Sequence, residues 1–368
     1  MIKVLLVYPL EQQWYRYLKY QFASDDSITY YILGSKEVSN SAEGMITVNL
    51  GRDLRLSSKL LSRTFGKVAG LKNIVEKISP DIVISKELFS SVTYQVSRLR
   101  GNFKHVVWCD EVTSPRISLY GKFPISRFYF EYNRKRARYF LFISNKSKEM
   151  LSPYCKEARR ILVVYPGVDN FLDKLKKEKD NKEFSFLFVG NIAENKGIKT
   201  MLNSIELLSE KTDKKFVLKI AGKGPLADLV QSTARGSDFV RYLGYVTELE
   251  KANLLRESDA FIYPAEDINF LWLKRWEEQG AISAIEAMAA GLPVIGSDSG
   301  SLPEIIRNDK MLFKQGNPYS LTEKMKMLLE NTECGKEIGE NNFIWSRANC
   351  NGPEQSKKVN EFLISLLT

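Results

Sequence analysis

Short apolar runs alternate with longer amphipathic stretches along the first 165 residues of the chain. The apolar runs predict buried strands at 4–7, 29–33, 45–48, 81–85, 106–108, 140–143 and 161–165. Helical spacing of apolar residues predicts helices over 14–22, 54–78 and 146–151, the last capped by Ser144. Strands that alternate with helices are typical of parallel βαβ units, so we expect a doubly wound sheet.

The same alternation begins again after the turn signal Pro166-Gly167-Val168-Asp169, which a charged stretch follows. Further strands are predicted at 184–189, 216–221, 240–243, 260–263 and 293–296. Further helices are predicted at 198–209, 227–235, 247–257, 282–290 and 321–329. The chain is therefore predicted to be an α/β protein of two Rossmann-like doubly wound domains that face a central cleft.

We expect the domain limits to follow this repeat. Residues 1–168 would form a basic N-terminal Rossmann-like domain, and 169–345 a C-terminal Rossmann-like domain. Residues 346–368 would form a helix that packs back towards the N-terminal domain. In open parallel sheets ligands bind outside the carboxyl ends of the strands, so the site is expected there.

Composition narrows the class of protein. The 368 residues are 44% hydrophobic and 27% charged, which is typical of a globular protein of two domains. Four scattered cysteines and one histidine argue against a disulfide scaffold and against a multi-histidine metal centre. No apolar run approaches the ~20 residues that span a bilayer, and the N-terminus lacks a signal-peptide cleavage site. We expect a cytoplasmic protein, which can also sit on the inner face of the membrane.

Positive charge is concentrated in the first half. Residues 1–170 carry 27 Lys and Arg against 15 Asp and Glu, or +12, whereas residues 171–368 carry 27 against 29, or −2. Five cations recur at steps of three and four on one face of the helix predicted over 54–78 and just before it: Arg52, Arg55, Lys59, Arg63 and Lys67. A second cluster over 127–138 mixes cations with aromatic residues. Either feature can be a solvated helix face or a contact with an anionic membrane, and no nucleic-acid motif accompanies them.

Strand ends in the second half carry the candidate chemistry. The first strand ends at Gly190 and is followed by a loop that contains Lys196. Backbone amides together with an ammonium group can bind a diphosphate. An ordinary βα loop without a ligand is the alternative. The second runs into Gly222-Lys223, where the lysine can touch phosphate or be solvated. The third, over 240–246, offers backbone groups to a nucleobase edge.

The fourth stretch places two carboxylates, Glu278 and Glu286, around a predicted helix start. Gly280 is small enough to let a ligand approach the backbone, and the helix N-terminus favours anions. One carboxylate can accept from sugar hydroxyls and the other from a ribose diol. Two surface carboxylates that merely flank a helix start are the alternative.

In this order and spacing, the four stretches resemble the C-terminal domain of family 4 glycosyltransferases, which are retaining enzymes of the GT-B fold. The resemblance covers residues 143–304 and includes the turn at 166–169. Downstream, Gly-Ser-Leu-Pro-Glu at 300–304 is similar to the Gly-Gly-x-Pro-Glu of the family. The combination carries the resemblance, since no single stretch is specific.

The resemblance implies that residues 1–168 bind the acceptor and residues 169–345 bind the nucleotide sugar. It also implies a role for each matching position. Lys196 would hold the donor diphosphate, Glu278 would contact the donor sugar and Glu286 would bind the ribose hydroxyls. The amides of residues 280–282 would approach sugar and phosphate, and the backbone of Val246 would meet the base. The donor-binding residues are thus predicted to be Gly190, Asn191, Lys196, Lys223, Val246, Glu278, Gly280, Ala281, Ile282 and Glu286.

The chain also departs from the family pattern. Asn191 stands where the family usually has Arg or Lys, so one charge of the diphosphate clamp is missing. Cys109-Asp110 stands where a His-Asp pair is common; Asp110 remains a candidate for contact with the reacting sugar, and Cys109 is either a catalytic thiol or a buried strand-end residue. His105 lies at the wrong end of that strand and is interpreted as structural. Tyr8-Pro9-Leu10-Glu11 replaces a glycine-rich loop.

About ten extra residues lie between Pro264 and Glu278 and include Trp272 and Trp276. They either stack on a sugar or form a packing insertion.

These observations predict a retaining hexosyltransferase with Lys196, Glu278 and Asp110 as catalytic residues. The donor would be a UDP or GDP sugar and the acceptor a lipid-linked molecule or a glycan, with a possible contact to an anionic membrane and none to nucleic acid. No Asp-x-Asp motif occurs, so no cofactor or metal is expected. Two alternatives are a non-catalytic sugar-nucleotide-binding protein, favoured by Asn191 and Cys109, and a sugar-nucleotide epimerase of related fold.

Overall fold

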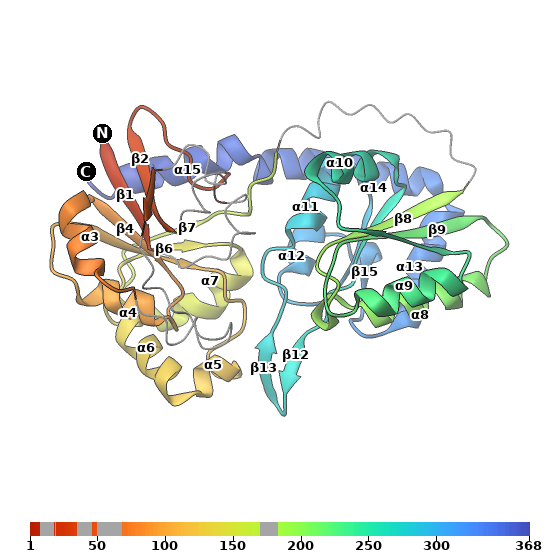
Figure 1. Cartoon of the computed structure of the whole chain (residues 1–368), viewed down its shortest axis with the longest axis horizontal. Coiled ribbons are helices and arrows are strands. Elements are labelled where there is room, and N and C mark those ends of the chain that lie inside the picture. The colour runs from red at the N-terminus through yellow and green to blue at the C-terminus, as the bar shows by residue number, and fades with distance from the viewer. Residues whose placement is uncertain (8–17, 19, 35–45, 50–67, 170–182) are drawn as a thin grey trace. The chain divides into compact units, whose positions relative to one another are not determined.

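The computed structural model describes residues 1–368 except 8–17, 19, 35–45, 50–67 and 170–182 (Figure 1). It divides into two compact units. The first comprises Met1–Gly167, Phe270–Arg275 and Gly352–Thr368, and the second comprises Val168–Asn269 and Trp276–Asn351. The chain thus leaves the first unit beside the turn at 166–169 and re-enters it twice, once for six residues and once at its end.

The first unit is built on a seven-stranded parallel sheet in the order β3-β2-β1-β4-β5-β6-β7. Its strands are β1 (Ile2–Val7), β2 (Ile28–Gly34), β3 (Ile46–Asn49), β4 (Ile82–Lys86), β5 (Lys104–Cys109), β6 (Tyr139–Phe142) and β7 (Arg160–Val163). Its helices include α3 (Leu71–Ile78), α4 (Ser91–Arg98), α5 (Leu119–Lys122), α6 (Pro124–Arg134) and α7 (Asn145–Leu151). The strands predicted from apolar runs in this half are confirmed within a few residues.

The two-residue period of a strand explains why β1 is apolar throughout. Val4 and Leu6 face a cluster that contains Val359 and Leu363 of the C-terminal helix. Leu5 and its alternate neighbour Val7 face the opposite cluster, which contains α3 and α4 side chains. Both faces of the strand are therefore covered, as in other parallel sheets.

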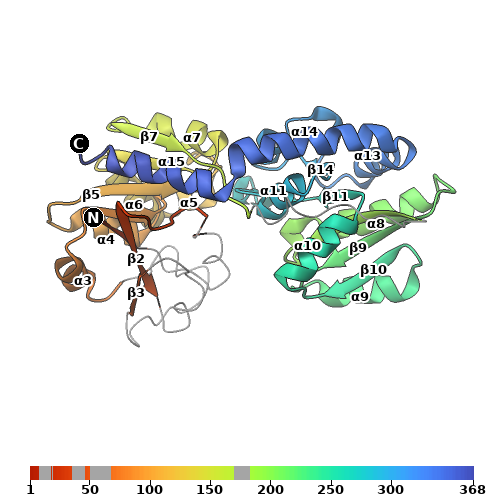
Figure 2. The same cartoon turned by 90° about the horizontal axis from the view of Figure 1, so that it is seen from above.

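Helix α15 (Gly352–Ile364) returns to the first unit at the end of the chain. Figures 1 and 2 show it lying along one face of the seven-stranded sheet. Its Asn360 accepts from the Tyr30 hydroxyl at 2.6 Å and donates to Asp25 at 2.6 Å, so it is fixed by polar as well as apolar contacts.

The helix predicted over 54–78 is confirmed at 71–78 but is wrong as a continuous helix, since residues 68–70 are not helical. Helix α3 begins only at Leu71, because Gly70 adopts a left-handed conformation with φ 65° and ends any helical path from the residues before it. Residues 54–67 lie outside the described residues. Helix α7 agrees with its prediction, and the Ser144 side chain accepts from the Ser147 amide at 3.1 Å as its cap.

The second unit contains a six-stranded parallel sheet in the order β10-β9-β8-β11-β14-β15. Its strands are β8 (Phe184–Val189), β9 (Phe216–Ala221), β10 (Val240–Gly244), β11 (Ala260–Tyr263), β14 (Val294–Ser297) and β15 (Leu312–Phe313). Its helices include α8 (Ile198–Ser209), α9 (Ala227–Gly236), α10 (Glu248–Glu257), α11 (Ile282–Ala289), α12 (Leu302–Ile306), α13 (Pro318–Glu330) and α14 (Thr332–Cys350). The predicted doubly wound α/β class is confirmed for both halves.

The extra residues before Glu278 form a hairpin of β12 (Ile268–Phe270) and β13 (Leu273–Trp276). These two strands pair with each other in a two-stranded sheet of their own (Figure 1). The sequence pattern did not predict this hairpin. In the described part of the chain, no helix has the length and apolar character needed to cross a membrane.

Candidate active site

The carboxyl edge of the six-stranded sheet collects the predicted residues of the second unit. Lys196 ends the 3-10 helix η6 (Glu194–Lys196) in the loop that follows β8. The next residue, Gly197, has φ 61°, and a Cβ there would lie 1.8 Å from the Pro264 carbonyl oxygen. Because only glycine permits this approach, the β8 loop packs directly against the end of β11, which brings Lys196 beside Tyr263.

Lys196 and Glu278 form a buried ion pair, although they are 82 positions apart. The Lys196 Nζ donates to Glu278 Oε2 at 2.5 Å and to the Tyr263 hydroxyl at 2.9 Å. The same nitrogen lies 5.0 Å from the ring centroids of both Tyr263 and Trp276. The two side chains are 17% and 6% exposed, so the pair is largely removed from water. The structure thus joins two of the three predicted catalytic residues.

The loop after Glu278 folds around its carboxylate. The amides of Gly280 and Ala281 donate to Glu278 Oε1 at 3.3 and 3.0 Å. Ala281 adopts a left-handed conformation with φ 43°, which turns these amides inward just before helix α11. Two amides that were predicted to approach a donor therefore hold Glu278 in this structure.

The backbone of Glu278 is fixed from the other side. The Ser299 hydroxyl accepts from its amide at 3.2 Å, and the Ser301 amide donates to its carbonyl at 2.9 Å. A Cβ at Gly300, which has φ 51°, would lie 1.9 Å from that carbonyl oxygen. The glycine of the 300–304 motif is therefore required for the loop after β14 to pack on Glu278.

Electrostatics keep Glu278 charged. Burial by itself raises the pKa of this carboxyl, but the Lys196 ammonium and the amide of Ala281 outweigh burial and hold the pKa below its usual value. A buried carboxylate that is still ionised is a strong hydrogen-bond acceptor. The pair can therefore present both an acceptor for hydroxyls and a cation for an anionic group.

Glu286 lies on α11 and is paired with a lysine of α10. Lys251 Nζ donates to Glu286 Oε1 at 2.6 Å and lies 2.9 Å from Glu248. The side chains of Lys251 and Glu286 are 11% and 10% exposed. The Lys251 contact fixes the orientation of the predicted ribose-binding carboxylate.

The remaining predicted residues surround these pairs on neighbouring strand ends. Gly190 follows β8 and Asn191 is exposed, with its Oδ1 packed against Gly224. Lys223 is exposed after β9, and its Nζ lies 5.0 Å from the Tyr245 ring centroid. Val246 is half-buried in the loop between β10 and α10, and Ile282 begins α11. None of these contacts is a buried charge pair.

The second half of the chain matches a known protein family. Residues 169–345 match the family model described as glycosyl transferases group 1. This part of the chain is similar to that family. The match includes every strand of the six-stranded sheet and both carboxylates around α11.

Curated relatives match part of the chain at moderate identity. An uncharacterized glycosyltransferase of Methanocaldococcus jannaschii is 27% identical over 226 residues, which are 60% of this chain and 58% of the relative. Spore coat protein SA of Bacillus subtilis is 29% identical over 179 residues, or 44% and 45% of the two chains. The chain spans about half of the length of these curated relatives.

Solved structures match the whole chain at low identity. A sucrose-phosphate synthase from Thermosynechococcus elongatus has a TM-score of 0.74 at 15% identity and covers 100% of this chain and 99% of its own. HepE of Anabaena in complex with UDP and glucose has a TM-score of 0.71 at 14% identity, with coverage of 99% and 100%. These similarities show that the chain has the GT-B fold.

The first unit carries a second buried charge cluster. Asp110, just after β5, forms an ion pair with Lys86 at the end of β4, and the two side chains are 4% and 6% exposed. Glu87, which directly follows Lys86, accepts a hydrogen bond from the Asp110 amide through its Oε1 at 2.8 Å. Glu87 Oε2 and Asp110 Oδ1 have no hydrogen-bond partner among the described residues. Both groups lie at the carboxyl ends of their strands.

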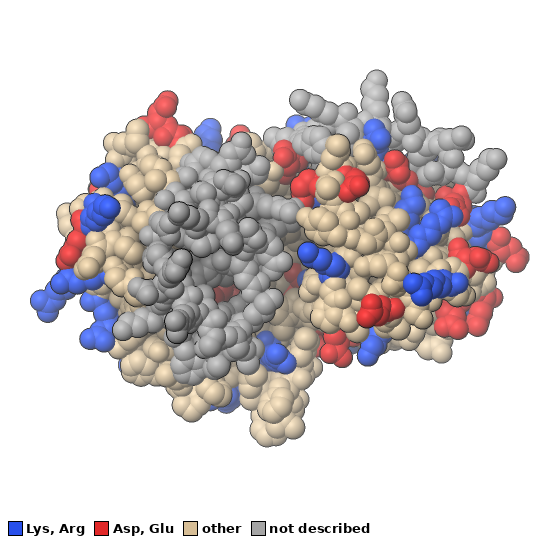
Figure 3. All heavy atoms as spheres, in the orientation of Figure 1, with Lys and Arg blue, Asp and Glu red and all other residues tan. Residues whose placement is uncertain are grey.

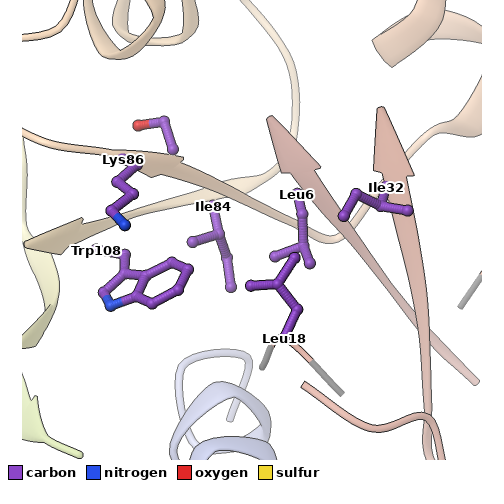
Figure 4. A pocket seen from close by; sticks show the side chains of 7 residues that line it. Leu6, Leu18, Ile32, Ile84, Lys86 and Trp108 are labelled. Carbon is purple, nitrogen blue, oxygen red and sulfur yellow. The ribbon is translucent and has the colours of Figure 1, made fainter. Parts of the chain in front are cut away.

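The cluster borders a small apolar cavity (Figure 4). Figure 4 shows the Lys86 side chain directed at Trp108, and its Nζ lies 4.4 Å from the centre of that ring. The cavity is lined by Leu6, Leu18, Ile32, Ile84, Ser85, Lys86 and Trp108. The predicted catalytic residue Asp110 lies in the first unit, where it forms an ion pair with Lys86 and its amide donates to Glu87.

Burial decides the roles of Cys109 and His105. Cys109 is fully buried, and burial followed by the negative charge of Glu87 raises its pKa well above the usual value, which disfavours a catalytic thiolate. His105 lies at the amino-terminal part of β5, where burial lowers its pKa to about 4 and its Nε2 lies 2.8 Å from the hydroxyl of Ser85 in β4. Both observations agree with packing roles.

Two of the remaining predictions fall on residues that the structure does not describe, and another concerns Trp272 and Trp276. The cationic face Arg52, Arg55, Lys59, Arg63 and Lys67 lies outside the described residues, as does Tyr8-Pro9-Leu10-Glu11. Trp276 lies beside Lys196, whereas Trp272 is 80% exposed.

Sequence reasoning missed the partners of the predicted residues, namely Lys86, Glu87, Lys251 and Tyr263. Lys86 and Glu87 directly follow a predicted buried strand and Tyr263 ends another, so the strand-end rule that selected Lys196 could have found them. Lys251 carried no such signal, because a lysine within a polar helix is ordinarily solvated.

Proposed function

We propose that the protein is a retaining glycosyltransferase that moves a hexose from a nucleoside diphosphate sugar, of the UDP or GDP type, to a lipid-linked or glycan acceptor. The observation that carries this proposal is the buried Lys196–Glu278 pair at the strand ends of a group 1 domain. HepE, whose fold this chain shares, is complexed with UDP and glucose, and a mutant of TarM of S. aureus is complexed with Fondaparinux, alpha-GlcNAc-glycerol and UDP. Phosphatidyl-myo-inositol mannosyltransferase of Mycobacterium leprae is a curated relative with a lipid acceptor in its name.

The proposed chemistry uses each member of the pair differently. Cleavage of the bond from the anomeric carbon to the diphosphate creates an oxocarbenium-like sugar and a growing negative charge on the leaving group. The Lys196 ammonium would stabilise that negative charge more in the transition state than in the ground state. The Glu278 carboxylate would accept hydrogen bonds from donor-sugar hydroxyls, and Glu286 would accept from the ribose.

Asp110 would contact the reacting sugar from the first unit, supported by its position at a strand end and by its Oδ1, which has no hydrogen-bond partner among the described residues. In the proposed reaction a lysine rather than a divalent cation neutralises the leaving group, in keeping with the lack of an Asp-x-Asp motif in the sequence. Neither a metal nor another cofactor is part of the proposal.

The test is turnover of UDP and GDP sugars by the full chain, followed as release of the nucleoside diphosphate. We expect Lys196→Ala and Glu278→Ala to lower kcat/KM by about 100-fold or more, because removal of one preorganised charge at a transition state costs ~3–4 kcal/mol. Addition of EDTA is expected to leave the wild-type rate unchanged.

Lys199→Ala, which removes an exposed lysine three residues from Lys196, is the matched control and is expected to keep wild-type turnover. Because Lys196→Ala leaves Glu278 buried without its cation, the double variant Lys196→Ala/Glu278→Gln separates loss of chemistry from loss of stability. Wild-type turnover in a stably folded Lys196→Ala protein contradicts the proposed role.

A second candidate function is that of a non-catalytic protein that binds sugar nucleotides. The neutral, exposed Asn191 and the buried thiol of Cys109 at two departures from the family pattern favour it. A thermal-shift screen of nucleoside diphosphates and their sugars decides between the two: binding without turnover of any donor supports the non-catalytic function.

A further inference from the structure

Three consecutive apolar side chains are exposed at the tip of the β12–β13 hairpin. Phe270, Leu271 and Trp272 are 58%, 71% and 80% exposed. Leu271 has φ 56°, a left-handed conformation that is unfavourable for a branched side chain, so the tight turn holds the run outward at a conformational cost. Single exposed apolar residues are ordinary, but a contiguous run marks an interaction site.

A second exposed apolar segment belongs to the same compact unit as the tip. Ile117, Phe123 and Phe128, around helices α5 and α6, are 45%, 52% and 51% exposed. The two segments are joined, since the Lys274 amide donates to the Ile117 carbonyl at 2.8 Å and Ser118 pairs with Lys274 in a β-bridge. Phe270–Arg275 and residues 116–129 both lie in the first unit.

The charge on these segments has one sign. Neither 116–129 nor 268–276 contains an acidic residue, and together they carry five cations. These cations are Arg116, Lys122, Arg127, Lys274 and Arg275. Figure 3 shows the outer end of the hairpin as uncharged surface, with no acidic group on it. We call the six apolar residues and five cations together the apolar-basic surface.

We propose that the apolar-basic surface binds an anionic lipid bilayer, with Phe270, Leu271 and Trp272 inserted among the headgroups. Tryptophan and phenylalanine suit the bilayer interface, and neighbouring cations are attracted to anionic lipid. A second copy of the chain would bring like charges together, and a nucleic acid offers no apolar medium for Ile117 or Leu271. This inference goes beyond the proposed transfer reaction and does not depend on it.

The first experiment measures co-sedimentation of the full chain with vesicles of phosphatidylcholine, alone or mixed with phosphatidylglycerol. The wild type is expected to bind the mixed vesicles, and Leu271→Asn/Trp272→Ser to lower the partition coefficient by about tenfold or more, because the tip supplies the inserted apolar area. Asparagine tolerates the left-handed conformation at 271, so the hairpin is expected to keep its turn. An unchanged thermal midpoint confirms that the fold is intact.

The matched control is Tyr319→Ser/Ile344→Ser, which removes two apolar side chains that are 62% and 66% exposed in the second unit. It is expected to bind vesicles as the wild type does. An equal loss of binding in this control, or wild-type binding by the tip variant, overturns the proposal.

The second experiment tests the cations. Arg127→Glu/Arg275→Glu is expected to lower binding to the phosphatidylglycerol vesicles by about tenfold or more, and high salt to lower wild-type binding, since exposed charges are screened. If the wild type instead dimerises through the tip, or binds an oligonucleotide and no vesicle, the occupant is not a bilayer and the proposal fails.

Discussion

Lysines at strand ends neutralise buried carboxylates in both units. Lys196 pairs with Glu278 after β8, and Lys86 pairs with Asp110 at the end of β4. Removing two charges from water costs several kcal/mol for each ion, which their attraction repays only when the geometry is good, so such pairs contribute little to stability. Their position at the carboxyl ends of parallel strands, where ligands bind, favours a functional interpretation.

Glu87 supplies a pH-dependent prediction at this scale. Burial, and then the negative charges of Asp110 and Glu111, raise the pKa of the Glu87 carboxyl from 4.5 to about 8. Between these values the folded protein keeps the proton and the unfolded chain loses it, so the free energy of unfolding falls as the pH rises. Glu87→Gln removes this loss and is expected to gain stability over the wild type from pH 5 to pH 8.

The upper limit of that gain is about 5 kcal/mol, the free energy equivalent of the whole pKa shift. Urea unfolding at several pH values between 5 and 8 measures it. Glu76→Gln, which replaces an exposed carboxylate of α3, is the control and is expected to keep the wild-type pH profile. A Glu87→Gln curve parallel to the wild type across this range contradicts the raised pKa.

At the scale of secondary-structure elements, helices α10 and α11 are joined by the ion pair between Lys251 and Glu286. Helix α10 begins with a capping box in which Thr247 and Glu250 satisfy each other, and this cap fixes the first turn from which Lys251 reaches Glu286. Lys251→Met leaves Glu286 buried without its cation and is expected to lower the free energy of unfolding by about 3–5 kcal/mol.

The double variant Lys251→Met/Glu286→Gln is expected to recover much of that loss, because no buried charge remains. Denaturant unfolding of the two single variants and the double variant gives the coupling. Additive effects would show that the 2.6 Å contact does not couple the helices. If Glu286 binds the ribose, both variants are also expected to bind nucleoside diphosphates more weakly than the wild type.

At the scale of the whole molecule, the last helix stabilises the unit that begins the chain. Leu363 of α15 is fully buried against β1 and β2 side chains. Leu363→Ala is expected to destabilise the first unit by about 2–5 kcal/mol, the range for a large-to-small change in a core. Hydrogen exchange of the β1 and β2 amides reports this directly, although the substitution is more than 320 residues away.

Leu367→Ala, near the end of the same segment, is the control, since Leu367 is 39% exposed. It is expected to leave the exchange of β1 and β2 amides as in the wild type. Equal protection in the Leu363→Ala protein would mean that α15 does not stabilise the sheet.

The sequence by itself determined the class of fold and the candidate loops. A strand buried on both faces is apolar throughout, and a helix repeats every 3.6 residues, so each βα unit is readable from a local window. For the same reason the strand-end positions of Lys196 and Asp110 and the position of Glu278 before a helix start were predictable, and residues 169–345 match the group 1 family model.

Only the tertiary structure decided which of these residues meet. Lys196 and Glu278 are 82 positions apart, and Asp110 pairs with Lys86 because β4 and β5 are neighbours in the sheet. The hairpin before Glu278, the return of α15 and the break at Gly70 also depend on contacts or a backbone conformation that a local pattern does not specify. Local periodicity sets the elements, whereas pairing of distant charges depends on strand order and on close approaches such as that of Gly197 to Pro264.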